Sequence, residues 1–316
     1  MKKIAFLAFV LSGMVTLGFA QEFYFRAGLG YAFPATAQST YDTPIPYYEY
    51  QSAYNGTRTI NANGTQTYNI KTASLSAGVQ SVIGLGYMFT ENIGVQLDAG
   101  IGISNNTYTF NDNNVPLNVG SSTTIPYNIS TTQHANSPVF MIPSLVLQTS
   151  GDKIKAYSRF GFALPLNTKV TQDQIFTNGA GTGALTVDDF TWQIKSGFSL
   201  GYTAAAGIKY KISDKVSLWA ELSLLSVSVY TKEQDLKSWV EDGQNVPLSN
   251  YTTAQTIKFS KTATIDSTYS QFPAYAQPFS NMGINVGINI TISKHERAAK
   301  DDGDYIDKSK PFRRNN

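Results

Sequence analysis

Apolar and polar residues alternate one by one through several segments of this chain. Residues 93–103 show the pattern most clearly, because every second position is apolar and the positions between are small or polar. The apolar positions are Ile93, Val95, Leu97, Ala99, Ile101 and Ile103, and the intervening ones are Gly94, Gln96, Asp98, Gly100 and Gly102. Because successive side chains of a strand point to opposite faces, this period of two predicts a β-strand with two unlike faces.

The same alternation, less regular in places, predicts eight strands. They run over Phe23–Phe33, Ser81–Phe89, Ile93–Ile103, Val139–Thr149, Ile154–Leu164, Trp192–Ile212, Val216–Val229 and Met282–Ile292. An even number of strands is what a closed bacterial barrel requires. Two weaker alternating segments, Thr67–Leu75 and Thr252–Thr264, leave two alternatives open. They are either strand extensions above the membrane or one extra hairpin, which would give ten strands.

The connections between these strands alternate between short and long. The short ones are Thr90–Asn92, Ser150–Lys153 and Ser213–Lys215, and the long ones are Pro34–Gln80, Ser104–Pro138, Pro165–Thr191 and Tyr230–Asn281. This asymmetry is typical of transmembrane barrels. We therefore expect an all-β fold, an eight-stranded antiparallel up-and-down transmembrane β-barrel with four long extracellular loops and three short periplasmic turns. The polar loop composition predicts exposed, variable and partly mobile loops.

The less apolar face of each strand favours a membrane barrel over a soluble barrel or sandwich. A soluble fold would turn that face to water and should carry Lys, Glu and Thr there. Here the face holds mostly Gly, Asn, Gln and Ser, which fit the narrow interior of a small barrel. Aromatic residues near strand ends are candidates for two interfacial girdles. These are Phe23, Tyr87, Phe89, Trp192, Tyr202 and Tyr210.

Composition narrows the function classes. The 316 residues include no cysteine, which excludes disulfides, a thiol nucleophile and Cys-ligated zinc or iron–sulfur sites. The formal net charge of +2 gives no field that would attract nucleic acid. Lys2 and Lys3, an apolar run and the small residues Gly18 and Ala20 predict a signal peptide over residues 1–20. We expect the barrel over residues 21–293 and a charged, disordered periplasmic tail over 294–316.

Three segments resemble the small outer-membrane β-barrel proteins of the OmpA/OmpX-like superfamily. They are GLGYMFTENIGVQLDAGIGIS (84–104), AYSRFGFALP (156–165) and VSLWAELSLLS (216–226). The resemblance covers about residues 22–292 as a pattern rather than a strict motif, and it implies an eight-stranded barrel in the outer membrane with both termini in the periplasm. The last strand ends at Ile292 without the final aromatic residue of many members, and residues 294–316 are too short for the peptidoglycan-binding domain of OmpA itself.

Four charged residues fall at similar depth on the predicted inner face: Arg26, Asp98, Arg159 and Glu221. Two cations and two anions in a tight barrel should pair, because unpaired buried charge is costly. We therefore predict a barrel-interior charge layer that plugs the bore. Two alternatives stay open: interior water solvates these groups without specific pairing, or the layer belongs to a gated ion path.

Three functions are compatible with the sequence. The first is a structural or surface-interaction role, in which long loops such as residues 41–54 meet an extracellular partner. The second is a narrow pore for small or hydrophobic solutes, and the third is a membrane-embedded hydrolase. The only histidines, His134 and His295, have no neighbouring nucleophile pattern, so we expect no enzyme, no cofactor and no metal site. The expected partners are outer-membrane lipid and a surface partner, not nucleic acid.

Overall fold

A closed barrel forms one half of the molecule. The computed structural model describes residues 22–35, 56–104, 107–119, 123–178, 186–251, 254–262 and 270–294. Eight strands close in the order β1-β19-β13-β12-β9-β8-β5-β4, and every neighbouring pair is antiparallel. The strands are β1 (Glu22–Pro34), β4 (Gly78–Met88), β5 (Ile93–Gly102), β8 (Val139–Gln148), β9 (Ile154–Asn167), β12 (Gly201–Lys211), β13 (Val216–Ser226) and β19 (Asn281–Lys294). The prediction of eight strands rather than ten is confirmed.

The two ends of the barrel differ. The short connections β4–β5, β8–β9 and β12–β13 lie at one end, here called the turn end, which confirms the three short turns. Glu22 pairs with Met88 and with Lys294, so the start of β1 and the end of β19 lie there too. The opposite end, here called the loop end, carries the long connections. The predicted signal peptide, residues 41–54 and residues 295–316 lie outside the described residues.

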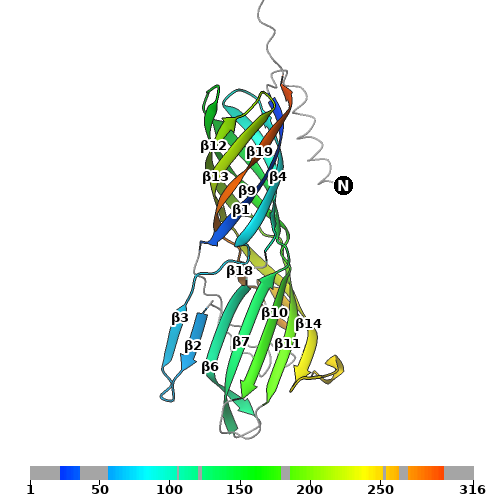
Figure 1. Cartoon of the computed structure of the whole chain (residues 1–316). Helices are drawn as coiled ribbons and strands as arrows, with labels where there is room; N and C mark the ends of the chain where they lie inside the picture. Colours follow the sequence, from blue (N-terminus) through cyan, green and yellow to red (C-terminus); the bar gives the residue numbers. More distant parts are fainter. Residues whose placement is uncertain are drawn as a thin grey trace, which may run out of the picture.

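A second sheet continues from the loop end (Figure 1). This distal sheet has eleven strands, with the path β17-β16-β14-β11-β10-β7-β6-β2-β3 and with β15 and β18 paired to β14. Its strands are β2 (Gly56–Ile60), β3 (Gln66–Ile70), β6 (Thr107–Val119), β7 (Thr123–Ala135), β10 (Val170–Asn178), β11 (Val187–Ser196), β14 (Ser228–Glu241), β15 (Gln244–Asn245), β16 (Thr256–Ser260), β17 (Gln271–Pro273) and β18 (Ala276–Pro278). A short 3₁₀ helix, η1 (Leu248–Asn250), follows β15.

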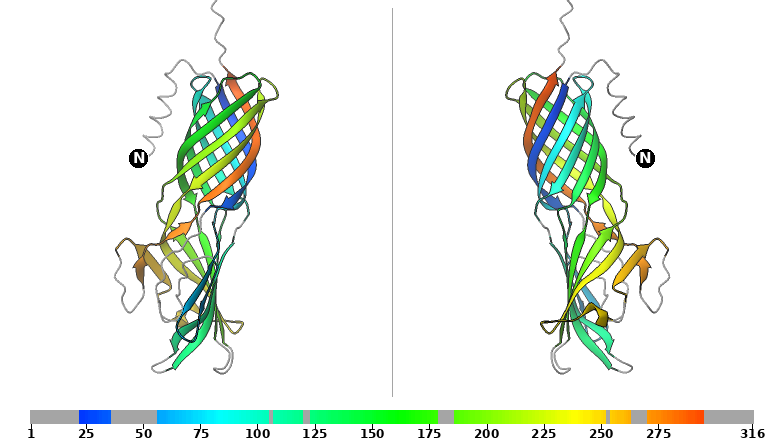
Figure 2. Two further views of the ribbon diagram at one scale, coloured as in Figure 1. Left: turned by 90° about the vertical axis from the view of Figure 1, so that its left-hand side faces the viewer. Right: turned by 90° about the vertical axis from the view of Figure 1, so that its right-hand side faces the viewer.

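The distal sheet shows that the long connections are not loops throughout. Most described residues of the long connections form paired strands, and both side views show the sheet extending away from the barrel (Figure 2). The weakly alternating segments 67–75 and 252–264 contribute β3 and β16 to this sheet and add no barrel hairpin. Within the described ranges no helix has the length and hydropathy to cross a bilayer.

The predicted bounds of two strands were wrong, because each predicted strand runs from one sheet into the other. The segment 192–212 divides into the end of β11, in the distal sheet, and β12, in the barrel. The segment 216–229 divides between β13 and the start of β14. Alternation in the sequence continues across both boundaries, so a period of two does not mark where a chain leaves one sheet for another.

The two sheets bury different faces. The barrel strands turn apolar side chains outward. Leu97 is 45% exposed, Ile284 51% and Leu222 64%. The distal sheet packs its apolar face inward around Phe190 and Trp192, both 0% exposed. Trp192 was expected in an interfacial girdle, and this placement is wrong.

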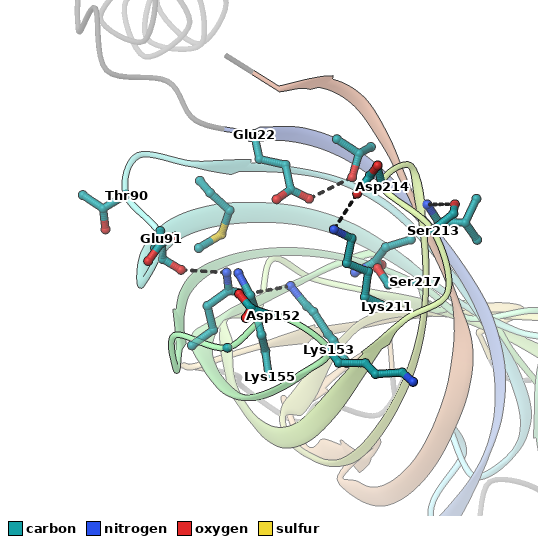
Figure 3. A pocket seen from close by; sticks show the side chains of 17 residues that line it. Glu22, Thr90, Glu91, Asp152, Lys153, Lys155, Lys211, Ser213, Asp214 and Ser217 are labelled. Carbon is teal, nitrogen blue, oxygen red and sulfur yellow. Dashed lines mark hydrogen bonds and ion pairs between the residues drawn. The ribbon is translucent and has the colours of Figure 1, made fainter. Parts of the chain in front are cut away.

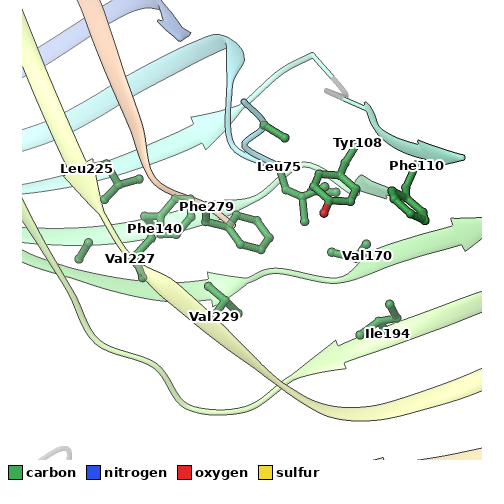
Figure 4. Packing of buried hydrophobic residues seen from close by; sticks show 13 residues of the cluster. Leu75, Tyr108, Phe110, Phe140, Val170, Ile194, Leu225, Val227, Val229 and Phe279 are labelled. Carbon is green, nitrogen blue, oxygen red and sulfur yellow. The ribbon is translucent and has the colours of Figure 1, made fainter. Parts of the chain in front are cut away.

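A second apolar cluster joins the two halves. It contains Phe140 and Leu225 from the barrel together with Tyr108, Phe110 and Ile194 from the distal sheet, and Phe279 lies between the two groups (Figure 4). The rings of Phe140 and Phe279 lie edge to face with their centroids 6.0 Å apart. Because this cluster contains residues of both sheets, burial of apolar area couples the barrel to the distal sheet.

Candidate functional site

The four predicted interior charges come from alternate strands of the barrel. Arg26 lies on β1, Glu221 on β13, Arg159 on β9 and Asp98 on β5. Around the barrel, one other strand lies between each of these strands and the next. At the depth of these charges the intervening strands contribute uncharged residues such as Gly84, Ala205 and Asn285, which leaves room for the charged groups. At Gly84 on β4, an added Cβ would lie 2.0 Å from Asp98 Oδ1. Glycine is therefore required there by the close approach of the carboxylate.

The structure brings all four charged groups into contact. Arg26 Nη2 lies 2.8 Å from Glu221 Oε2. Arg159 Nη2 lies 2.6 Å from Glu221 Oε1, and Arg159 Nη1 lies 3.0 Å from Asp98 Oδ2. These four residues are here called the charge layer. Arg159 bridges both carboxylates, so the layer is continuous across the bore.

Hydrogen bonds extend the layer toward the turn end. Tyr157 Oη donates to Glu221 Oε2 at 2.8 Å. Tyr24 Oη donates to Gln96 Oε1 at 2.8 Å, and Gln96 Nε2 donates to Asp98 Oδ2 at 2.7 Å. The two bonds that end on Glu221 and Asp98 are charge-assisted, which makes them stronger than neutral ones, and they hold both carboxylates in place.

Arg26 is held differently from Arg159. Its Cζ lies 3.6 Å from the centre of the Trp219 ring, a cation–π contact. Its Nε and Nη1 have no hydrogen-bond partner among the described residues. The ring and the contact with Glu221 therefore supply the stabilisation of this charge, and they leave two of its nitrogens without hydrogen bonds.

The charge layer separates the interior of the barrel into two parts. Its four side chains are at most 4% exposed. A cavity of about 200 Å³ lies on the turn side, lined by Lys209, and one of about 40 Å³ lies on the loop side, lined by Thr203. Ala205, which pairs with Arg159, lies between Lys209 and Thr203 on the inner face of β12. The bore is therefore filled by side chains at the level of the layer.

Sequence reasoning found the charges but missed the aromatic and amide partners. Tyr24, Tyr157 and Trp219 share the inner face by the same alternation, so their side of the strand was predictable. One general rule could have indicated that they are partners of the charges: a buried charge needs hydrogen bonds beyond its counter-ion. Asn285, whose Nδ2 lies 3.4 Å from Glu221 Oε1, was missed in the same way.

The histidine considered for catalysis lies far from this layer. His134 is on β7 in the distal sheet, paired in register with Thr107 and Thr171. No hydrogen bond joins it to a described serine or aspartate. His295 lies outside the described residues. The arrangement around His134 therefore offers no catalytic pair within the described part of the chain.

No protein-family model and no curated protein matches this chain. Among solved structures it is similar to the solution structure of the Escherichia coli Outer Membrane Protein W, with 15% identity, a TM-score of 0.33, and 87% of this chain and 99% of that one covered. It is also similar to a Pseudomonas aeruginosa FadL homologue, with 8% identity, a TM-score of 0.17, and 86% and 88% covered. At these scores the fold assignment rests on the strand pairing of this chain itself.

Proposed function

We propose that this chain is an outer-membrane β-barrel protein in which a closed barrel anchors the distal sheet and the sheet presents an interaction surface. The proposal is supported first by the outward face of the barrel. Exposed large hydrophobic residues gather on the barrel strands, whereas the strands of the distal sheet contribute only Tyr68, Ile175 and Tyr230 within the described residues. An apolar band around a closed barrel has no stable place in water but fits the hydrocarbon core of a bilayer.

The asymmetry of the connections supports an orientation. Barrels of this membrane place short turns in the periplasm and long connections outside the cell. By this rule the turn end, with the ends of β1 and β19, faces the periplasm. The distal sheet then stands on the outer surface of the cell.

The observation that supports an anchoring role most strongly is that the charge layer closes the bore. Four side chains that are at most 4% exposed fill the bore, and they pair across it. A pore for hydrophobic solutes needs a continuous lumen, and ligand pockets for such molecules measure roughly 300–1,000 Å³. The cavity on the loop side measures about 40 Å³. The closed bore favours an anchor over a pore, and the proposal includes no catalytic step.

The distal sheet supports a role in recognition through its order. A sheet built on a buried aromatic core presents its outward side chains in a fixed arrangement, which lowers the entropy lost on binding. Tyr68 (45% exposed) and Tyr230 (52% exposed) lie on this sheet. Tyrosine is enriched in protein interfaces because it offers a large apolar ring and a hydroxyl. The proposed partner is therefore a macromolecule outside the cell.

Planar-bilayer recording tests the closed bore. The purified full chain should insert without producing discrete conductance steps, because the layer leaves no continuous path. Steady conductance steps from the wild-type chain would overturn the anchor and favour the narrow pore. Heat-denatured chain at the same detergent concentration controls for leakage.

Single-cysteine labelling tests the orientation, because the chain contains no cysteine of its own. Lys258→Cys on β16 and Lys215→Cys in the β12–β13 turn are a matched pair of exposed lysines. A membrane-impermeant maleimide should label Lys258→Cys on intact cells and Lys215→Cys only after lysis. The reverse order would place the distal sheet in the periplasm and contradict the proposed surface role.

A further inference from the structure

The turn end of the barrel contains a cavity of about 200 Å³ that the anchoring role does not use (Figure 3). Charged side chains of both signs line it. The lysines are Lys153, Lys155, Lys209 and Lys211, and the acids are Glu22, Glu91, Asp152 and Asp214. A water molecule occupies about 30 Å³ in the liquid, so the cavity has room for a hydrated small ion.

The acids and the lysines occupy different depths. Glu91, Asp152 and Asp214 lie exposed in the turns, and Asp214 pairs with Lys211 at 2.6 Å. Glu22, which faces the cavity from β1, accepts a hydrogen bond from Thr291 Oγ1 at 2.9 Å. Three of the four acids therefore lie at the rim of the cavity, and Glu22 is the one that faces it from the barrel wall.

Two lysines stand deeper on the inner wall. Lys155 of β9 and Lys209 of β12 are directly opposite each other in the strand register. Like charges directly opposite on neighbouring strands destabilise a sheet. Neither ammonium group forms an ion pair with a carboxylate of the described residues, although Lys209 Nζ donates to Gln148 Oε1 at 3.1 Å. The tyrosine rings of Tyr24 and Tyr157 lie 4.8 and 5.1 Å from Lys209 Nζ.

The charge layer does not compensate this pair. Its two acids pair with its two arginines, so the layer offers no carboxylate to Lys155 or Lys209. Arg26, the member of the layer that lies on β1, is itself positive, and its Nε and Nη1 have no hydrogen-bond partner among the described residues. Two neighbouring cations without a paired carboxylate attract an anion locally, although the cavity as a whole is lined by charges of both signs.

From this geometry we infer that Lys155 and Lys209 form a binding site for a small anion of the phosphate or carboxylate type. The anion lies between the two ammonium groups in the turn-end cavity and relieves their repulsion. Gln148 and Asn289, which also line the cavity, place amide groups beside it. This inference is independent of the proposed surface role, because it concerns the opposite end of the barrel.

Thermal unfolding of the full chain in an uncharged detergent tests the site. Inorganic phosphate, compared with chloride at equal ionic strength, should raise the unfolding temperature of the wild type in a saturable way. Lys155→Gln and Lys209→Gln should each weaken the apparent phosphate affinity at least about tenfold, because each removes a charged partner. Lys258→Gln, an exposed lysine on the distal sheet, removes the same charge and should keep the response.

The variants also test the site when no phosphate is present. In chloride, Lys209→Gln should unfold at the same temperature as the wild type or higher, since it removes like-charge repulsion. A wild type that does not respond to phosphate overturns the inference. So does a response that is equal in Lys209→Gln and Lys258→Gln, which would show non-specific ion binding.

Two sources of the same chemistry are separated by a vesicle experiment in chloride. The full chain is compared in phosphatidylcholine vesicles with and without phosphatidylglycerol. Stabilisation by phosphatidylglycerol that Lys209→Gln abolishes assigns the site to a lipid headgroup. A phosphate response in detergent without any effect of phosphatidylglycerol assigns it to a free anion.

Discussion

The barrel and the distal sheet use the same alternation in opposite ways. In the barrel, Ile288 points outward and is 39% exposed, while Glu221 on the inner face is 3% exposed. In the distal sheet, Ile175 points outward and is also 39% exposed, while Phe190 on the inner face is 0% exposed. One sheet encloses charge within an apolar surface, and the other encloses aromatic rings within a largely polar one.

The difference teaches that the solvent decides which face of a two-faced strand is buried. A polar interior is stable where the outer face meets lipid, provided that every charge inside finds a partner. An apolar interior is stable where the outer face meets water. The apolar cluster around Phe140 and Phe279 marks the level at which one arrangement gives way to the other.

The largest expected effect comes from removing the shared acid of the charge layer. Glu221→Gln leaves Arg159 with Asp98 alone and Arg26 without a paired carboxylate among the described residues. Unpaired buried charge should cost about 3–5 kcal/mol of unfolding free energy. Urea unfolding in phospholipid vesicles, followed by tryptophan fluorescence, measures the loss. Glu241→Gln, at the exposed end of β14, should change stability by no more than about 0.5 kcal/mol. Equal losses in the two variants would show that the layer is not a buried ion network.

A matched pair of isoleucines tests the outward faces. Ile288→Arg in the middle of β19 should cost about 2–4 kcal/mol if that position faces the bilayer. Ile175→Arg on β10, with the same 39% exposure, should stay within about 0.5 kcal/mol because it faces water. The same urea unfolding measures both. If both variants unfold like the wild type, the barrel surface is not in lipid.

Two interior glycines test how closely the charge layer is packed. At Gly84 an added Cβ would lie 2.0 Å from Asp98 Oδ1, so Gly84→Ala should cost about 1–3 kcal/mol. At Gly100 the nearest atom would be Ile142 Cδ1 at 3.5 Å, an ordinary contact, so Gly100→Ala should fold almost as well as the wild type. A Gly84→Ala variant as stable as Gly100→Ala would contradict the tight packing around Asp98.

The smallest expected effect is a pH dependence of the distal sheet. Burial alone would raise the pKa of Asp235, but hydrogen bonds from Lys195 and Thr256 outweigh it and hold the pKa below its ordinary range. A lowered folded-state pKa adds stability that is present above about pH 4 and is lost as the pH falls through the folded value. Asp235→Asn should therefore flatten this loss in urea unfolding between pH 5 and pH 2. Because Lys195, whose Nζ lies 2.8 Å from Asp235 Oδ2, is 44% exposed, 1 M salt should reduce the difference between the two chains. A difference unaffected by salt would contradict an ion pair that solvent reaches.

The charge layer was open to prediction because it follows from two regularities. A period of two assigns each residue to a face, and short turns fix the depth of residues on neighbouring strands. Arg26 and Glu221 could thus be placed at one level from the sequence. The contact between Arg26 and Trp219 could not, because alternation gives the side of a strand but not the direction of a long side chain.

The distal sheet could not be predicted from the same pattern. Trp192 and Tyr202 occupy positions of the same parity in one continuous alternation, yet Trp192 is 0% exposed and Tyr202 is 63% exposed. The pattern is identical whether an apolar face meets a core or a lipid. In addition, the inner face of this sheet buries Gln133, Gln172 and Gln174, so segments of its strands have the composition of polar loops.

The central claim is that the barrel and the distal sheet bury opposite kinds of face. The most direct test is to measure whether lipid or water surrounds each of the two matched isoleucines. Nitroxide labels at Ile288→Cys and Ile175→Cys, in a chain without other cysteines, report collisions with oxygen, which dissolves in lipid, and with a water-soluble nickel chelate. We predict that the label at 288 is relaxed mainly by oxygen and the label at 175 mainly by nickel. Equal relaxation of both labels by nickel would show that the barrel faces water, and it would contradict the account.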